Sequence, residues 1–238
     1  MLLLGGLTVG ILNFSNKPEE NKLDQPEQSY SGLPWQITPT PEGYSEVFGF
    51  TLGTDNLATA IQSLGPDHEI ALIETDTSSS IEAYDANYTA GPIKGRLVLV
   101  ADVSPEKIKT IRNNAAHVEY LETGNKKFTL NKDDRQQALN SLIKTVTFIP
   151  VINLDEEIIT QRFGKADKTI TRGKEETIYL FPKKGLSISL YTDTKEVLQY
   201  VAPKNFSWLS NGVIEKISTE TAEEEISKEG TKTPNKEI

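Results

Sequence analysis

Cysteine is absent from the 238 residues of this chain, and methionine and histidine are scarce, with one and two copies. Without thiols the chain forms no disulfide, no thiolate metal site and no cysteine nucleophile. It also lacks the cysteine that a bacterial lipoprotein carries after its signal, so we expect no lipid anchor. Such a chain is suited to an oxidising compartment as well as to a reducing one.

Positively charged residues are fewer than negatively charged ones. The chain has 25 lysines and arginines against 34 aspartates and glutamates, which gives a formal net charge of −9. Binding a nucleic-acid backbone requires clustered lysines and arginines that displace counterions, so we expect no nucleic-acid partner. The sequence also lacks a glycine-rich phosphate loop and a Gly-x-Ser-x-Gly nucleophile elbow.

Long apolar runs are also rare, and the clearest one opens the chain. Met1–Phe14 carry no charged side chain, whereas Ser15–Gln28 are almost wholly polar. We interpret residues 1–16 as a membrane signal-anchor, although the first 14 residues span only about 21 Å as a helix, less than the ~30 Å hydrocarbon core. Three alternatives remain open: the core of a cleaved signal peptide, an anchor whose first residues precede the written start, and a core helix or strand of the folded body.

The polar stretch after this segment is rich in Gln, Glu, Asn, Ser and proline, with Pro18, Pro26, Pro34, Pro39 and Pro41. It buries too little apolar surface to offset the entropy of ordering, which predicts a disordered tether over 17–43. We expect Trp35 to be the point where the tether first contacts the body. At the other end, residues 211–238 are mostly Glu, Lys, Thr and Ser and predict a disordered acidic tail.

One pattern occurs twice in the remaining body, 99 residues apart, beginning at Phe50 and at Ile149. Each copy has a short apolar stretch, a capping residue, acids early in the following segment, and a glycine (Gly65 or Gly164) after the last apolar residue. These are the start and stop signals of a short helix. We predict a duplication, with one repeat in 44–130 and the second in 131–210.

Apolar strands follow each predicted helix, at 70–73, 81–84 and 97–100, and then at 169–171, 177–181, 186–190 and 197–201. The alternation of Leu186, Ile188 and Leu190 with serines predicts a sheet with one face buried and one face in water. Between the copies, Ser104-Pro105 and Asn131 start two helices around a hairpin at 118–130. The predicted fold class is therefore α+β: two repeats of a short helix and an antiparallel β-meander, an intervening helix–hairpin–helix, and an N-terminal membrane helix.

A helix ending in Leu-Gly or Phe-Gly, followed by a meander with a Tyr-x-x-x-x-x-Gly-Leu strand, resembles the BamE/SmpA family of small outer-membrane lipoproteins. The residues that carry the resemblance are 54–66 with Leu64-Gly65-Pro66, and 153–167 with Phe163-Gly164-Lys165-Ala166, followed by Tyr179, Gly185, Leu186 and Val197. The resemblance implies a non-enzymatic adaptor on an envelope assembly, with a helix pair packed on a three-stranded sheet. This chain departs from the family pattern in lacking the lipidated cysteine.

Candidate chemical groups are few and scattered. His68 and His117 are the only imidazoles, and neither has a second histidine at metal-ligand spacing. The pairs Asp133-Asp134 and Glu156-Glu157 open predicted helices, where acids complement the helix dipole, and Glu223–Glu225 lies in the predicted tail. We therefore predict no catalytic residue, no metal site and no cofactor.

Aromatic residues gather around the last predicted strand and give the one interaction signal of the sequence: Tyr191, Tyr200, Phe206 and Trp208. Large aromatics usually close a core, which is one interpretation of this group. The other is an exposed contact patch for a partner, next to a sheet edge that could accept an added strand. We predict these four residues as the partner contact.

Together these features predict a single-pass inner-membrane protein whose body lies in the periplasm and acts as a non-enzymatic binding or adaptor module. The membrane contact is the N-terminal segment, and the expected partner is another envelope protein or a wall component. Two alternatives remain open: a hydrolase that uses carboxylates, which requires a pocket holding two acids with perturbed pKa values, and a soluble cytoplasmic domain.

Overall fold

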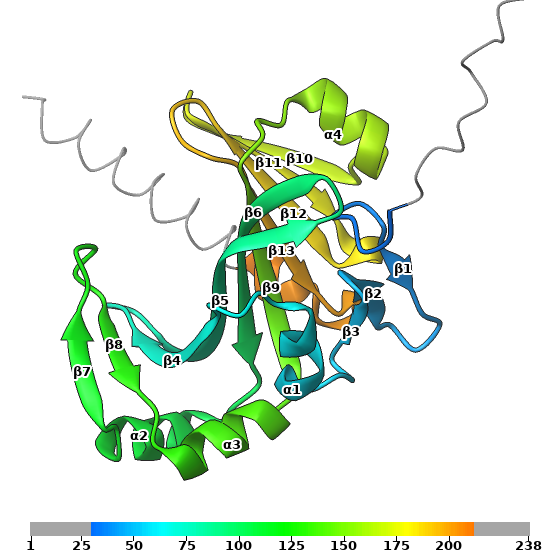
Figure 1. Cartoon of the computed structure of the whole chain (residues 1–238). Helices are drawn as coiled ribbons and strands as arrows, with labels where there is room; N and C mark the ends of the chain where they lie inside the picture. The colour runs from blue at the N-terminus through cyan, green and yellow to red at the C-terminus, as the bar shows by residue number, and fades with distance from the viewer. Residues whose placement is uncertain (1–29, 212–238) are drawn as a thin grey trace, which may run out of the picture.

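The computed structural model describes residues 30–211, and its main feature is one ten-stranded antiparallel sheet (Figure 1). The strand order is β10-β11-β12-β13-β9-β6-β5-β4-β8-β7, so the two longest stretches of pairing, β5 with β6 and β6 with β9, lie near its middle. The strands are β4 (Glu69–Glu74), β5 (Ser79–Ala90), β6 (Ile93–Ala101), β7 (His117–Tyr120), β8 (Lys126–Thr129), β9 (Ile143–Pro150), β10 (Lys168–Arg172), β11 (Glu176–Phe181), β12 (Leu186–Tyr191) and β13 (Val197–Val201).

A second, three-stranded sheet precedes it in the chain, in the order β1 (Thr38–Pro39), β2 (Ser45–Val47) and β3 (Phe50–Leu52). The turn between β2 and β3 contains Phe48, whose φ of 56° is in the left-handed region that a bulky residue rarely adopts. Its ring is buried against Tyr88, Phe148 and Tyr200, with centroids 5.3 to 5.8 Å away. Burial of this ring offsets the backbone strain and fixes the small sheet on the large one.

The helices are short and are started by side-chain caps. They are α1 (Leu57–Ala60), α2 (Pro105–Asn113), α3 (Lys132–Asn140) and α4 (Glu156–Phe163), with 3₁₀ turns η1 (Ile61–Ser63), η2 (Pro182–Lys184) and η3 (Pro203–Asn205). Asn56, Ser104, Asn131 and Asp155 each accept a hydrogen bond from the amide three residues on, as N-caps do. The helix starts predicted at Ser104-Pro105 and Asn131, and the hairpin between them, therefore match α2, α3 and β7–β8.

The predicted fold class is wrong in its architecture. The two supposed meanders are not separate repeats, because β6 and β9 pair directly and join all their strands into one sheet. The apolar stretches that open the two copies are not equivalent either: β3 belongs to the small sheet, whereas β9 lies inside the large one. The first predicted helix is only the four-residue α1 followed by η1. Capping and alternation specify elements locally, but they do not specify which strands pair.

The predicted membrane helix over 1–16, the first part of the tether and the tail from 212 onward lie outside the described residues. Between residues 30 and 211, none of the helices combines the length and the apolar character that crossing a bilayer requires.

The core lies mainly on one face of the large sheet. This face is covered by the small sheet, α1 and the helices α2 to α4. The largest side chains of the core include Phe148, Phe181 and Tyr200 from the sheet and Phe163 from α4. Gly95 in β6 makes room for one of them, because a Cβ at this position would lie 2.4 Å from Cε2 of Phe148. The packing at the centre of the sheet therefore requires a residue without a side chain at position 95.

The opposite face was expected in water, but part of it is covered. Ile178, Leu180 and Val201 form a small second cluster there with Phe206, from the segment after β13. Ser187, one of the serines predicted to be solvated, is buried on this face beside Leu180, its cross-strand partner. The chain after β13 thus folds back across the sheet, which the alternation pattern alone does not indicate.

Candidate functional site

The first described residues, 30–36, form a tight loop that we name the N-terminal loop. Gln36 closes it: its Oε1 accepts a hydrogen bond from the Leu33 amide, and its Nε2 donates one to the Tyr30 carbonyl, both at 2.9 Å. The hydroxyl of Tyr200, on β13, donates a hydrogen bond to the Pro34 carbonyl at 3.1 Å. These contacts attach the loop to the body at positions far apart in the sequence.

The β5–β6 turn supports the N-terminal loop from one side. Gly91 has a φ of +59°, and a Cβ there would lie 2.9 Å from side-chain carbons of both Leu33 and Tyr30. Only glycine lets the turn approach the loop this closely without strain. Position 91 is therefore fixed by packing as well as by backbone conformation.

Helix α4 supports the loop from the other side through Trp35. The indole ring meets Phe163 edge to face, with centroids 6.4 Å apart. The guanidinium of Arg162 lies over the same ring, 4.8 Å from its centroid. Trp35 thus packs against the hydrophobic core and against a cation at once, which fixes its orientation.

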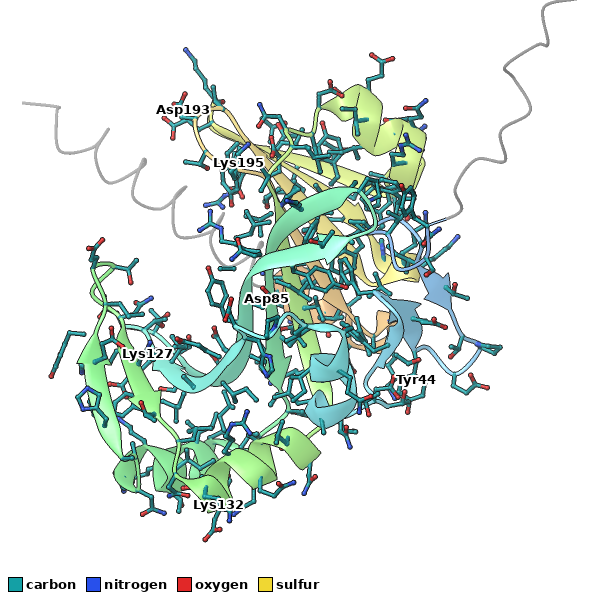
Figure 2. All side chains as sticks on the ribbon, in the orientation of Figure 1. Tyr44, Asp85, Lys127, Lys132, Asp193 and Lys195 are labelled. Carbon is teal, nitrogen blue, oxygen red and sulfur yellow. The ribbon has the colours of Figure 1, made fainter. Side chains whose placement is uncertain are left out.

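A third wall comes from the residues that follow β9. Lys195, labelled in Figure 2 on the β12–β13 turn, donates hydrogen bonds to the Val151 carbonyl at 2.8 Å and to Oδ1 of Asn153. This side chain fastens the exposed segment 151–153 to the β12–β13 turn. Ile152 and Leu154 then line the space between this segment, α4 and Trp35.

Between these walls lies a groove of about 720 Å³, which we name the Trp35 groove. It is lined by Tyr30, Leu33, Trp35, Gln36, Pro92, Ile93, Ile152, Leu154, Ile158, Gln161 and Arg162. Most of these side chains are apolar, and Arg162 is the one charged residue among them. Tyr30, Ile152 and the adjacent Val151 are 41%, 46% and 64% exposed. Exposed apolar side chains that gather around a groove are typical of a binding surface.

The four aromatics predicted as a partner contact lie in different places. Tyr200 is fully buried on the core face of the sheet, and burial raises the pKa of its hydroxyl well above the ordinary value. Phe206 is buried on the opposite face. Trp208 is 44% exposed, with the Lys144 ammonium 5.0 Å from its ring centroid. Tyr191 is half-buried at the end of β12, and burial also raises its pKa. The structure does not bring these four together into one patch.

The positions of the titratable residues that the sequence singled out are explained by the local structure around them. His68 Nδ1 lies 2.8 Å from the Gly65 carbonyl in the loop before β4, and His117 is exposed on β7. Asp134 is buried at the start of α3, where Asn131 and Lys107 contact its carboxylate. The pair Glu156-Glu157 occupies the first turn of α4. Within residues 30–211 no three His, Cys, Asp or Glu side chains are grouped as metal ligands.

Two further acids lie inside the sheet. Asp85 is buried and accepts hydrogen bonds from the amides of Gly65 at 2.7 Å and Asn87 at 2.8 Å, beside the β-bulge of β5. It therefore fixes the bulge and the loop that precedes β4 (Figure 2). Burial raises the pKa of Glu82, and the Ser80 hydroxyl donates to its Oε1 at 2.5 Å.

Sequence reasoning identified Trp35 as a contact of the body but missed the groove beside it. The available signal was Val151-Ile152, two large apolar residues directly after a strand that ends in proline. Comparisons with protein-family models, curated proteins and solved structures found no match for this chain. The resemblance to the BamE/SmpA family therefore stays a prediction.

Proposed function

We propose that this chain is a non-enzymatic protein-binding module whose Trp35 groove takes an apolar segment of a partner protein. The observation that carries the proposal is the exposure of Tyr30, Val151 and Ile152 around one apolar groove. Burying such side chains against a partner removes apolar surface from water, which is the main driving force of association. Hydrogen bonds and packing already hold the walls, so little ordering cost opposes binding.

The charge of the groove indicates which kind of partner segment it can bind. Arg162 is the one charged lining residue in a chain whose net charge is −9. Its guanidinium lies over Trp35 and has a planar array of donors, which is suited to a carboxylate. The partner segment should therefore combine apolar side chains with an acidic residue or a terminal carboxylate.

For the cellular setting we propose that residues 1–16 anchor the chain in the inner membrane and that the body lies in the periplasm. The hydropathy of Met1–Phe14 and the resemblance to envelope adaptors support this. Anchoring would raise the effective concentration of the groove near a membrane-associated partner.

Site-specific crosslinking tests the groove. A photoreactive phenylalanine analogue replaces Ile152 in the full-length chain, in its native host, and adducts are identified by mass spectrometry. We expect one discrete adduct that is lost when Arg162→Glu is added, and none from the same label at Leu142, an exposed apolar position outside the groove. Adducts that are the same from both label positions, or that persist in Arg162→Glu, would rule out groove binding.

A reporter fusion tests the location separately. Alkaline phosphatase, which is active only outside the cytoplasm, is fused after Gln28, with and without residues 1–16. We expect activity with the segment and none without it. Activity in neither fusion would rule out the proposal that residues 1–16 are a membrane anchor, and it would not affect the groove proposal.

A further inference from the structure

A second cleft lies at the other end of the sheet and shares no lining residue with the Trp35 groove. It measures about 810 Å³ and lies between the β4–β5 turn, helix α2 and strand β8. We name it the α2 cleft. Its lining residues are Glu74, Thr75, Asp76, Thr77, Ser78, Ser79, Pro105, Ile108, Lys109, Arg112 and Lys126. It is polar where the Trp35 groove is apolar.

The register of the strands brings its polar residues into one row. Tyr120 pairs with Lys126, Lys126 with Glu74, and Glu74 with Ser79, across β7, β8, β4 and β5. Residues directly opposite each other in neighbouring strands point to the same face of a sheet. The cation, the carboxylate and the hydroxyl of this row line the cleft, and the ring of Tyr120 lies next to Lys126, just beyond the lining residues.

Glu74 fixes the positions of the two nearest cations. Its Oε2 lies 2.5 Å from Nε of Arg112, and its Oε1 lies 3.1 Å from Nζ of Lys126. The Arg112 guanidinium lowers the pKa of Glu74 below its ordinary value, and the Lys126 ammonium adds a smaller effect in the same direction. Arg112 also lies over the ring of Phe128, 5.6 Å from its centroid. The donors that Glu74 does not use are thus held in place toward the cleft.

The charges that line the cleft favour an anion. Lys109, Arg112 and Lys126 outnumber Glu74 and Asp76, so this surface is locally positive on an acidic protein. Lys109 makes no ion pair within residues 30–211 and is free to meet a ligand charge. A ligand carboxylate would find the ammonium of Lys109 and the unused N–H groups of Arg112.

The rim adds features that a simple anion would not need. The hydroxyls of Thr75 and Ser78 lie 3.0 Å apart on the β4–β5 turn, and Thr77 and Ser79 add two more. At the other end of the row, Tyr120 is 74% exposed, with Nζ of Lys126 6.0 Å from its ring centroid. Hydroxyls donate hydrogen bonds to a polyol and accept them from it, ammonium groups donate them, and an exposed ring packs on the apolar C–H face of a sugar.

We propose that the α2 cleft binds a carboxylated saccharide. The sugar ring packs on Tyr120, its hydroxyls contact the β4–β5 turn, and its carboxylate lies between Lys109 and Arg112. This site is independent of the proposed function, because the two clefts lie on different elements. Loss of crosslinking at Ile152 therefore does not change the result expected here.

The test is titration calorimetry of the full-length chain with three probes: trigalacturonate, the neutral trisaccharide maltotriose, and inorganic phosphate. We expect trigalacturonate to bind at least about tenfold more tightly than the other two, and more weakly as salt is raised. Equal binding of maltotriose would show that the cations play no part, and equal binding of phosphate would show an unspecific anion site. Either result, or no binding of trigalacturonate, overturns the proposal.

Variants with matched controls locate the site. Lys109→Gln and Tyr120→Ala change exposed side chains, and each should weaken trigalacturonate binding about fivefold or more. Lys132→Gln changes an exposed lysine on α3 (Figure 2), and Tyr84→Ala changes an exposed tyrosine on β5. Both positions lie outside the cleft, and both variants should leave binding unchanged. Binding that is lowered equally by both pairs of variants would place the saccharide elsewhere.

Discussion

The hydroxyl of Tyr200 donates a hydrogen bond to the Pro34 carbonyl, 3.1 Å away, across 166 positions of the chain. This contact links β13, next to the middle of the large sheet, to the N-terminal loop that forms one wall of the Trp35 groove. The ring of Tyr200 also packs on Phe48. One side chain thus joins the core, the small sheet and the groove.

Replacing Tyr200 with phenylalanine should destabilise the protein without disturbing its packing. The ring remains, but the Pro34 carbonyl loses its partner inside the structure, which typically costs about 1–3 kcal/mol. We expect a lower urea midpoint with an unchanged slope. Tyr84→Phe, at an exposed position, is the control and should leave the midpoint in place. A Tyr200→Phe midpoint equal to that of the unchanged protein would show that the bond contributes no net stability.

Gly95→Ala should be among the most damaging single-methyl changes in the chain. The new Cβ would lie 2.4 Å from Cε2 of Phe148 and 2.6 Å from the carbonyl oxygen of Ile149, so the two central strands must move apart. Overpacking of this kind costs on the order of 3 kcal/mol. Thermal unfolding measures it.

Gly124→Ala is the comparison for this change. Position 124 has open space around its Cβ and only the penalty of a positive φ, about 1–2 kcal/mol. If the two variants melt at the same temperature, the contact of Gly95 with Phe148 is not tight in solution.

Stability should depend on pH through Glu82. Burial raises the pKa of this carboxyl in the folded state above its unfolded value of about 4.3. The folded state therefore favours the protonated form. The stability that this contributes is complete below the unfolded pKa and is lost as the pH rises through the folded pKa.

Glu82→Gln keeps the shape of the side chain and removes its titratable carboxyl group. As the pH rises from 4 to 7, across the unfolded pKa of about 4.3, we expect the variant to become more stable relative to the wild-type protein. Denaturation midpoints of both proteins at a series of pH values give this difference directly, because their other titratable groups are the same. A difference that stays flat with pH would mean that Glu82 is solvated in the folded state.

Local signals in the sequence predicted many elements of the fold but not their arrangement. Ser104-Pro105 and Asn131 mark the starts of α2 and α3 because capping and proline act within one turn of helix. The pairing of β9 with β6 and β13 joins residues about fifty positions apart on each side. Alternation shows that a segment is a strand, but many strands have the same alternation, so it does not identify the partner.

The Trp35 groove was beyond sequence reasoning for a similar reason. Its walls come from residues 30–36, 92–93, 152–154 and 158–162, which meet only in the folded chain. Trp35 was recognised as a contact, yet its stretch also has the prolines and polar residues of a tether. The predicted aromatic contact depended instead on sequence proximity, but successive residues of a strand point to opposite faces. Tyr200 and Val201 consequently lie on different sides of the sheet, and Phe206 packs on the side of Val201.

Phe206 and Trp208 are two residues apart, and alanine at each position should have very different effects. Phe206 covers Ile178, Leu180 and Val201, so Phe206→Ala opens a cavity on that face and should cost about 3 kcal/mol. Trp208 is 44% exposed and contacts Lys144 through its ring, an interaction that contributes about 0.5–1 kcal/mol at such a site. Urea denaturation of the two variants should therefore separate them by roughly 2 kcal/mol. Equal losses would mean that Phe206 does not cover this second cluster in solution.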